Sequence, residues 1–191
     1  QELKIDFISH AFIIIKSDEF SFAMDPWATG PAFISGWWLK SPPAINWEKK
    51  LNACDFIYIS HNHPDHLNRH TLKHVKEDML FIFPNFISKS VEKILLREGF
   101  NNICKFNFQR YYRYKKTQLL LTILKSGDFR DDSGLYFTFG EFSFLSTVDA
   151  KNLNWNNFPK NITLFLSSFA GNSSGYPLCH EQIDDETKLK I

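Results

Sequence analysis

The sequence predicts an α/β protein in which two β-sheets pack face to face and helices lie outside them. Three observations support this prediction. Short apolar runs typical of strands occupy both ends of the chain, helical patterns fall in the middle, and one central run is apolar throughout, as expected for a strand buried on both faces. The length of 191 residues suits one domain. No linker or low-complexity tract interrupts it, so we expect a single domain over residues 1–191.

The N-terminal part predicts an antiparallel meander. Strand-like runs cover Lys4–Ile8, Phe12–Lys16 and Phe20–Met24, with polar or turn residues between them. An aromatic loop follows from Gly30 to Pro43, punctuated by glycine and proline. It is longer than a simple connection requires, and long loops often carry function.

The middle of the chain alternates strands and helices. Buried strands are expected at Cys54–Ser60 and Met79–Phe83, and helices at Thr71–Glu77 and Ser88–Arg97. Gly99 is placed as the stop of the second helix. The second half returns to strands, which we expect at Gln118–Leu124, Leu135–Phe139, Phe142–Thr147 and Ile162–Ser167.

The composition narrows the class of protein. Hydrophobic residues make up 43% and aromatic residues 16%, which fits an ordered globular chain. Lysine and arginine total 22 against 21 acidic residues, so no global field recruits nucleic acid or an anionic membrane. The apolar runs are strand-sized, far short of a membrane span.

The cysteines point to a reducing compartment. Cys54, Cys104 and Cys179 are odd in number and widely spaced, which matches neither a disulfide framework nor a C-x-x-C metal or redox motif. No basic stretch leads into an apolar run at the N-terminus, as a signal peptide requires. We therefore expect a cytoplasmic protein.

The segment SHNHPDHL carries the strongest chemical signal. Three imidazoles and one carboxylate, His61, His63, Asp65 and His66, follow directly on the buried strand. A tight turn at a strand end can aim alternate side chains at one point, so that His61 and His63 share one metal ion while Asp65 and His66 face a second. Zinc, iron and manganese sites use these ligand types. The alternative is a surface loop that happens to be rich in histidine.

The pattern H-x-H-x-D-H after a strand resembles the signature of the metallo-β-lactamase superfamily. Three segments are similar, more narrowly, to the sialic-acid hydroxylase family (the CMP-N-acetylneuraminate monooxygenases) and related bacterial proteins. They are MDPWATGPAFISGWW, IYISHNHPDHLNRHTLK and LSSFAGNSSGYP. The resemblance implies the αβ/βα sandwich of that superfamily and a centre of one or two divalent ions, zinc, iron or manganese.

The resemblance also implies roles for residues outside the motif. Asp25, at the end of the third strand, matches an aspartate that supports the metal loop; a turn-forming aspartate before Pro26 is the alternative. Asp149 matches the aspartate that bridges two metal ions.

Two ligand positions depart from the superfamily pattern. The loop KSGDFRDDSG lacks the expected histidine. Asp128 is the best positional match there, with Asp131 and Asp132 as competitors, and a carboxylate would tilt selectivity toward iron or manganese. His180 is the candidate for the last histidine ligand of the superfamily pattern. The alternative is that His180 is an ordinary exposed histidine in the tail. A shortened C-terminus would equally remove this ligand, so the centre is expected to be dinuclear, mononuclear or degenerate.

A small-molecule substrate is expected beside the metal. The resemblance implies a sugar nucleotide such as CMP-sialic acid. Its candidate contacts are Trp37 and Trp38 in the aromatic loop and Ser173, Ser174 and Tyr176 in the glycine- and serine-rich segment. The alternative, held equal, is that these two segments are structural loops capped by buried tryptophans.

Three functions compete. In the first, slightly favoured by how common it is on the fold, a metal-activated water hydrolyses the substrate and Asp65 orients or deprotonates that water. In the second, an iron centre hydroxylates a C–H bond; the three cysteines form no Rieske ligand pairs, so electrons must come from a missing domain or a separate protein. In the third, lost ligands leave a non-catalytic, metal-stabilised binding module.

Overall fold

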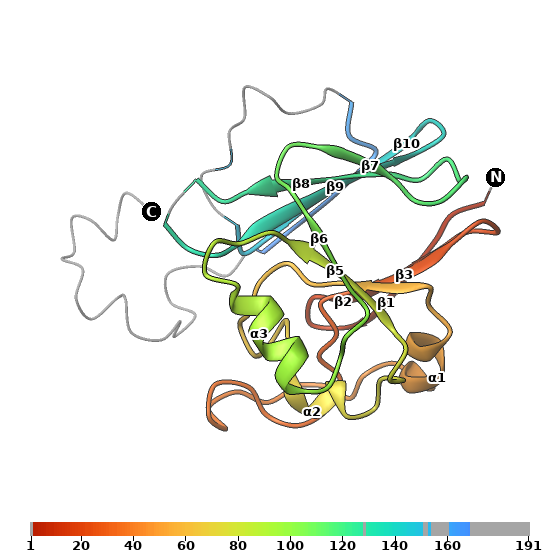
Figure 1. Ribbon diagram of the computed structural model, residues 1–191. Coiled ribbons are helices and arrows are strands. Elements are labelled where there is room, and N and C mark those ends of the chain that lie inside the picture. The colour runs from red at the N-terminus through yellow and green to blue at the C-terminus, as the bar shows by residue number, and fades with distance from the viewer. Residues whose placement is uncertain (1, 128, 151–152, 154–160, 169–191) are drawn as a thin grey trace, which may run out of the picture.

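The computed structural model describes residues 2–127, 129–150, 153 and 161–168. Its strands form two sheets that lie one above the other (Figure 1). The first sheet has six strands in chain order: β1 (Lys4–Ser9), β2 (Phe12–Lys16), β3 (Ser21–Met24), β4 (Phe56–Tyr58), β5 (Leu80–Pro84) and β6 (Ile103–Phe106). Its first two pairings are antiparallel and the other three are parallel, so the sheet is mixed.

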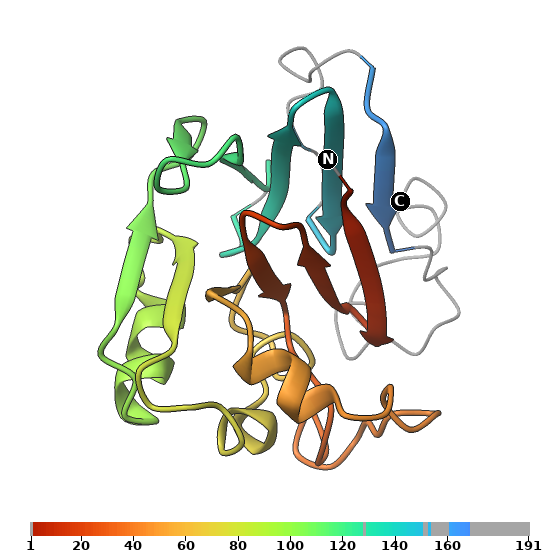
Figure 2. The same ribbon diagram turned by 90° about the vertical axis from the view of Figure 1, so that its right-hand side faces the viewer.

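The second sheet has five strands. In chain order they are β7 (Tyr111–Arg113), β8 (Leu120–Lys125), β9 (Ser133–Phe139), β10 (Phe142–Val148) and β11 (Leu164–Ser167). The first four pair antiparallel, and β11 pairs parallel with β10. Figure 2 shows β11, in blue, at the edge of this sheet.

The described helices all lie against the outer face of the six-stranded sheet (Figure 1). They are α1 (Trp47–Asn52), α2 (Arg69–Leu72) and α3 (Ser90–Arg97). The predicted sandwich of two sheets with helices outside is confirmed. In the described part of the chain, no helix is long and apolar enough to cross a bilayer.

Strands buried on both faces produce two cores. On β2, Ile13 and Ile15 join the core between the sheets, whereas Phe12 and Ile14 join the core beneath the helices. This alternation follows from the period of two residues in a strand. The core between the sheets is rich in rings, and Phe22 stacks on Phe56 with centroids 4.8 Å apart.

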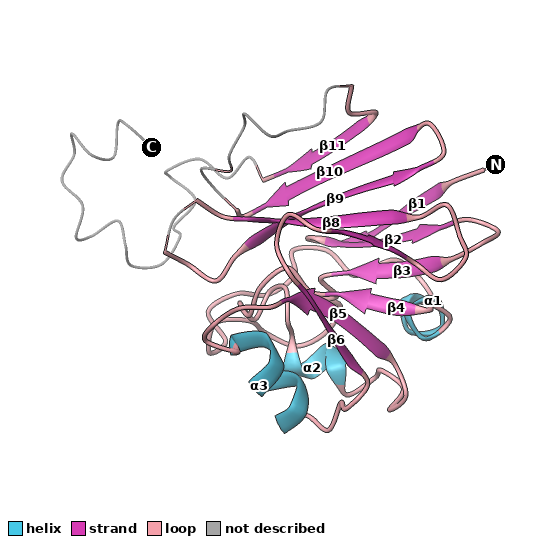
Figure 3. Cartoon of the chain, turned by 45° about the horizontal axis from the view of Figure 1, so that its top comes forward, coloured by secondary structure: helices cyan, strands magenta, loops and turns pink. Residues whose placement is uncertain are grey.

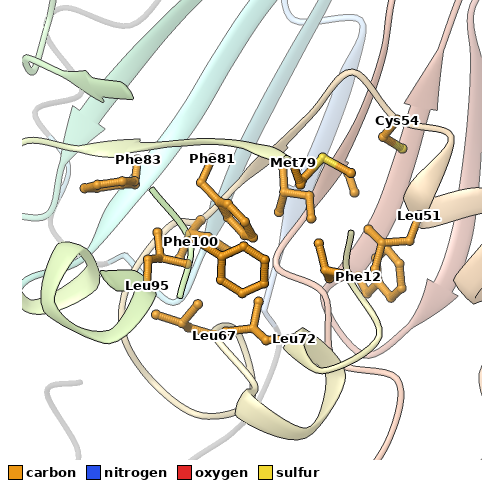
Figure 4. Close-up of a cluster of buried hydrophobic side chains, with 14 of the residues drawn as sticks. Phe12, Leu51, Cys54, Leu67, Leu72, Met79, Phe81, Phe83, Leu95 and Phe100 are labelled. Atoms are coloured by element: carbon orange, nitrogen blue, oxygen red, sulfur yellow. The ribbon is translucent and has the colours of Figure 1, made fainter. Parts of the chain in front are cut away.

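Figure 4 shows the core beneath the helices. Each helix contributes a leucine to it, namely Leu51, Leu72 and Leu95. They pack with Phe81 of β5, so the helices and the six-stranded sheet share one apolar layer. This layer fixes the sheet whose strand ends carry the candidate site.

Three elements differ from the sequence prediction. Helix α2 begins and ends earlier than expected, because the Asn68 side chain accepts a hydrogen bond from the Thr71 amide (2.9 Å) and so caps the helix. Helix α1 was not predicted; it is six residues long, has no side-chain N-cap and buries only Leu51. Strand β6 was not predicted either, and its two middle residues, Cys104 and Lys105, are exposed.

Candidate metal centre

The candidate site lies where several strands end at one edge. Strands β1, β3 and β4 run in the same direction, because β1 and β3 are both antiparallel to β2 and β4 is parallel to β3. His10 follows β1, Asp25 follows β3 and the histidine motif follows β4. Strand β10 of the other sheet ends at the same side of the molecule, and Asp149 follows it (Figure 3).

The ligand-type side chains form two clusters. The first consists of His61, His63 and Asp149, and the second of His10, Asp65 and His66; within each, the ligand atoms lie within 4.8 Å of one another. Asp149 Oδ2 lies 3.7 Å from His61 Nε2 and 3.2 Å from His66 Nε2. The structure therefore brings together the four motif residues and Asp149, with Asp149 between the two clusters.

Asp25 ties the motif loop to the end of β3. Its side chain is fully buried and accepts hydrogen bonds from the Ser60 amide (2.7 Å) and the Ser60 hydroxyl (2.6 Å). Its Oδ2 also lies 3.0 Å from His66 Nδ1. Asp25 thus fixes the start of the loop and turns the Nε2 of His66 toward the clusters, the arrangement in which a histidine ligand is oriented from behind.

A second set of contacts joins the two sheets behind His61. The Ser133 hydroxyl donates to the Ser60 carbonyl (2.7 Å) and lies 2.8 Å from the Tyr58 hydroxyl. His61 Nδ1 lies 2.9 Å from the Ser60 hydroxyl oxygen and 3.4 Å from Asp132 Oδ1. The Nδ1 side of His61 is therefore occupied, and its Nε2 is left for another partner.

Buried polar atoms without a hydrogen bond concentrate at this site. Six such side-chain atoms occur among the described residues, and four belong to the motif: His61 Nε2, His63 Nδ1, Asp65 Oδ1 and His66 Nε2. His66 Nε2 has its ion-pair distance to Asp149 but no hydrogen bond of proper geometry. An unsatisfied buried group costs about 1–3 kcal/mol, so four together call for a ligand. Imidazole nitrogens and carboxylate oxygens fit a divalent metal ion.

The protonation states of His61, His63 and Asp65 suit metal binding as well. Burial lowers the pKa of His61, and the neighbouring His66 and His63 lower it further; burial also lowers the pKa of His63. Burial alone would raise the pKa of Asp65, but hydrogen bonds with His10 and His66 outweigh it and hold that pKa below its usual range. Neutral imidazole and ionised carboxylate are the forms that coordinate a metal.

His66 differs from these residues in its protonation. Burial lowers its pKa, but contacts with Asp149, Asp25 and Asp65 outweigh burial and hold that pKa well above its usual value. A metal ion would therefore have to displace a proton there.

The three acids that compete for the third ligand position separate in space. Asp131 accepts hydrogen bonds from the hydroxyls of Ser88 and Ser90 at the start of α3. Asp132 is buried beside His61, and burial together with repulsion from Asp149 raises its pKa to about 7. Asp128 lies outside the described residues. So do the other predicted site residues His180, Ser173, Ser174 and Tyr176.

His10 was not among the site residues predicted from the sequence. This histidine stands alone in the turn between β1 and β2, far from the motif in the sequence, and its Nε2 lies 3.0 Å from Asp65 Oδ2. The strand directions were the available signal, because the end of β1 has to lie at the same edge as the ends of β3 and β4.

The backbone is strained around the clusters. His10, Asp25 and Val148 have left-handed conformations, with φ of 47°, 46° and 44°. Such conformations are uncommon outside glycine, and for a β-branched residue such as Val148 they are genuine outliers. They gather at functional sites where the surroundings hold them in place.

A cavity of about 530 Å³ opens beside His10 and is lined on one side by the aromatic loop. Trp37 and Trp38 are among its lining residues, and Trp38 is 66% exposed. Phe33 links this loop to the clusters, with ring centroids 4.8 Å from Trp37 and 5.9 Å from His63. The loop therefore borders both the cavity and the first cluster.

Comparison with known proteins establishes the fold. The chain has the metallo-β-lactamase fold. It superposes on a variant of the β-hydroxylase CmlA (TM-score 0.66, 21% identity, covering 100% of this chain and 41% of that one). It also superposes on an isothiocyanate hydrolase from gut bacteria of Delia radicum (TM-score 0.58, 19% identity, 75% and 61% covered).

The sequence is similar to cytidine monophosphate-N-acetylneuraminic acid hydroxylases. Identity is 33% with the Danio rerio protein, 32% with that of Asterias rubens and 30% with that of Mus musculus, each over 93% of this chain. The match covers 31%, 28% and 31% of those proteins, so the chain spans about a third of their length. No family model matches the chain.

Proposed function

We propose that the chain carries the metal centre of a hydroxylase that acts on a nucleotide-activated, N-acetylated sugar, with iron as the metal. The two adjoining clusters that meet at Asp149 are the observation that carries this proposal. The substrate class is that of the cytidine monophosphate-N-acetylneuraminic acid hydroxylases, which match 93% of the chain. The same match covers only about a third of those relatives, so the reaction is proposed for a protein that includes this chain.

The donor set suits iron. His61 and His63 would hold one ion, Asp65 and His66 would hold the other, and Asp149 would contact both. A site that mixes imidazole with several carboxylates suits iron and manganese as well as zinc. When bound, iron supplies the redox chemistry that activation of dioxygen requires, whereas zinc supplies only Lewis acidity.

The cavity beside His10 is the proposed substrate site. Its volume of about 530 Å³ is in the usual range for small-molecule sites. The rings of Trp37 and Trp38 offer flat apolar surfaces on which a nucleobase can stack. Lys40 also lines the cavity and supplies a positive charge for a phosphate or carboxylate.

The proposed reaction needs an electron donor. One oxygen atom of dioxygen enters a C–H bond of the substrate and the other leaves as water, which requires two electrons and two protons. In the described residues the cysteines are Cys54, which is buried, and Cys104, which is exposed. Neither lies in a pattern that could hold a Rieske cluster, so we propose delivery from another domain or a separate protein.

Hydrolysis is the second candidate. Asp65 Oδ1 is buried without a hydrogen-bond partner next to His66, a position from which a carboxylate can orient a water molecule. In that case zinc or manganese would take the place of iron, and the substrate would lose a phosphodiester, ester or amide bond rather than gain an oxygen atom.

Product analysis separates the candidates. The chain is loaded with iron under anaerobic conditions, mixed with CMP-N-acetylneuraminate and a chemical reductant, and then exposed to dioxygen. Mass spectrometry of the substrate is expected to show the gain of one oxygen atom, and labelled dioxygen supplies that atom. The zinc-loaded chain and His63→Ala are matched controls and are expected to give no such product.

Other outcomes decide against hydroxylation. Release of free CMP by the zinc-loaded chain, without any hydroxylated product from the iron-loaded chain, would replace the proposal with hydrolysis. If the longer protein that contains this chain binds metal but converts no substrate, even with the reductase system of a related hydroxylase added, the result would support the non-catalytic binding module.

A further inference from the structure

His10 occupies an unusual position for a residue in a hairpin turn. Its ring packs edge-on against Trp27 on one side, with centroids 5.2 Å apart, and against His66 on the other, at 5.6 Å. Its Nε2 points at Asp65 Oδ2 from 3.0 Å. The hairpin thus aims an imidazole nitrogen directly at the second cluster.

In the part of the chain that the structure describes, His10 is the side chain that joins Asp65 and His66 in the second cluster. Asp65 and His66 are the motif residues on this side, and both are buried, with 2% and 1% of their surface exposed. Asp65 Oδ1 and His66 Nε2 have no hydrogen-bond partner. His10, Asp65 and His66 place one ligand atom each within 4.8 Å of the others, which leaves them close enough to share one ion.

We propose that His10 is a ligand of the second metal ion, together with Asp65, His66 and the shared Asp149. In this arrangement the β1–β2 turn supplies the imidazole for which His180 was the predicted candidate. The proposal rests on the metal centre and does not depend on which reaction the centre performs.

His10 differs from the buried ligand-type histidines in its exposure to solvent. His10 is partly exposed and lines the cavity of about 530 Å³, whereas His61 and His66 are closed off from solvent. His10 is thus the member of the second cluster that lines the cavity, and it connects the proposed ion with the proposed substrate site.

A simpler role for His10 is to orient Asp65 through a hydrogen bond. The two roles differ in what a glutamine at this position achieves. The amide of glutamine can donate to Asp65 but is a poor ligand for a divalent transition metal. Loss of an orienting partner typically weakens metal binding by about 10- to 100-fold, whereas loss of a ligand weakens it further.

The test is metal stoichiometry with Mn(II) alone, without substrate or reductant. The metal-free chain, His10→Ala and His10→Gln are titrated by calorimetry, and bound manganese is counted by elemental analysis after gel filtration. We expect two ions in the unmodified chain and one in both variants, with the second ion weakened by more than about 100-fold. His74→Ala is the matched control, because His74 is an exposed histidine that pairs with Glu48. Circular dichroism checks that each variant is folded.

Several results would overturn the proposal. They are two ions bound at full affinity in His10→Ala, restoration of the second ion by His10→Gln, or a single ion in the unmodified chain. Loss of the second ion in His180→Ala but not in His10→Ala would return the role to His180. Failure of the hydroxylation assay leaves this titration unaffected, so the two proposals can fail separately.

Discussion

At the scale of single residues, the candidate centre depends on which nitrogen of each histidine is left available. Ser60 occupies Nδ1 of His61 and Asp25 occupies Nδ1 of His66, so both rings present Nε2. His63 instead has its buried Nδ1 without a partner. For His61 and His66, the available nitrogen is decided by Ser60 and Asp25, which are not ligands themselves. Substitution of such a neighbour should therefore change metal binding.

His63→Ala is expected to remove the ion of the first cluster while leaving the chain folded. The variant deletes one donor of the first cluster, and His63 is only partly buried, so the cores are unaffected. Elemental analysis of the purified variant measures the loss, and His74→Ala serves as the control. Unchanged metal content in His63→Ala would show that the ligand assignment is wrong.

Asp25→Asn is expected to weaken metal binding by about 10- to 100-fold without abolishing it. Asparagine is nearly isosteric and can still accept from the Ser60 amide. It cannot provide the negative charge that orients and polarises the ring of His66. Calorimetric titration with Mn(II) measures the affinity. An affinity equal to that of the unmodified chain would remove Asp25 from the support of the centre.

At the scale of elements, β4 and β9 connect the two sheets immediately behind the site. The Tyr58 hydroxyl, buried between the sheets, meets the Ser133 hydroxyl at 2.8 Å, and Ser133 in turn donates to the Ser60 carbonyl. The position of the motif loop therefore depends on both sheets, although every residue of the motif comes from one.

Tyr58→Phe is expected to lower the free energy of unfolding by about 0.5–1.5 kcal/mol, the usual net value of one hydrogen bond. Urea unfolding of the metal-free chain measures this change. The control is Tyr111→Phe, since Tyr111 lies on the short edge strand β7 with 59% of its surface exposed, and it should be neutral. Equal stability of the two variants would argue that the hydroxyl contact between the sheets contributes nothing.

The sequence predicted most elements because their signals are local. Strands such as β2 and β5 are continuous apolar runs, and α3 has a single apolar face. Helix α1 and strand β6 were not predicted because both are short, α1 is mostly polar and β6 has two exposed residues of four, so their formation depends on packing against neighbours. In the site, the motif could be found because its residues are adjacent in the chain. His10 lies far from the motif in the sequence, and finding it requires the strand directions of the sheet, which bring the end of β1 to the edge where Asp65 lies.

At the scale of the whole molecule, two apolar layers hold the six-stranded sheet from both sides. This burial has a chemical consequence at Cys54, which lies under α1 just before β4. Burial, and next the charge of Asp55, raise the pKa of its thiol to about 12. The thiol is therefore protonated throughout the neutral range.

Cys54 is expected to resist alkylation by iodoacetamide at about pH 8 in the folded chain, because the thiolate is the reactive form. Cys104 on β6 is exposed and should react much faster, and urea should remove the difference. Peptide mapping by mass spectrometry measures the labelling rates of both cysteines. Rapid native labelling of Cys54 would contradict the packing of α1 against the sheet.

The raised pKa of Cys54 also makes the stability of the fold depend on pH. Since the folded pKa lies above the unfolded value of 9.0, the stabilisation from Cys54 is complete below about pH 9 and is lost as the pH rises toward 12.

The central claim is that the strand ends of this fold build a metal centre, and elemental analysis of the chain tests it most directly. The measurement is made on protein purified without added metal and again after reconstitution with iron, manganese or zinc. We predict up to two divalent ions per chain, with iron retained from the purification. A chain that holds no metal, even after reconstitution, would contradict the claim and leave the four unsatisfied buried atoms of the motif without an explanation.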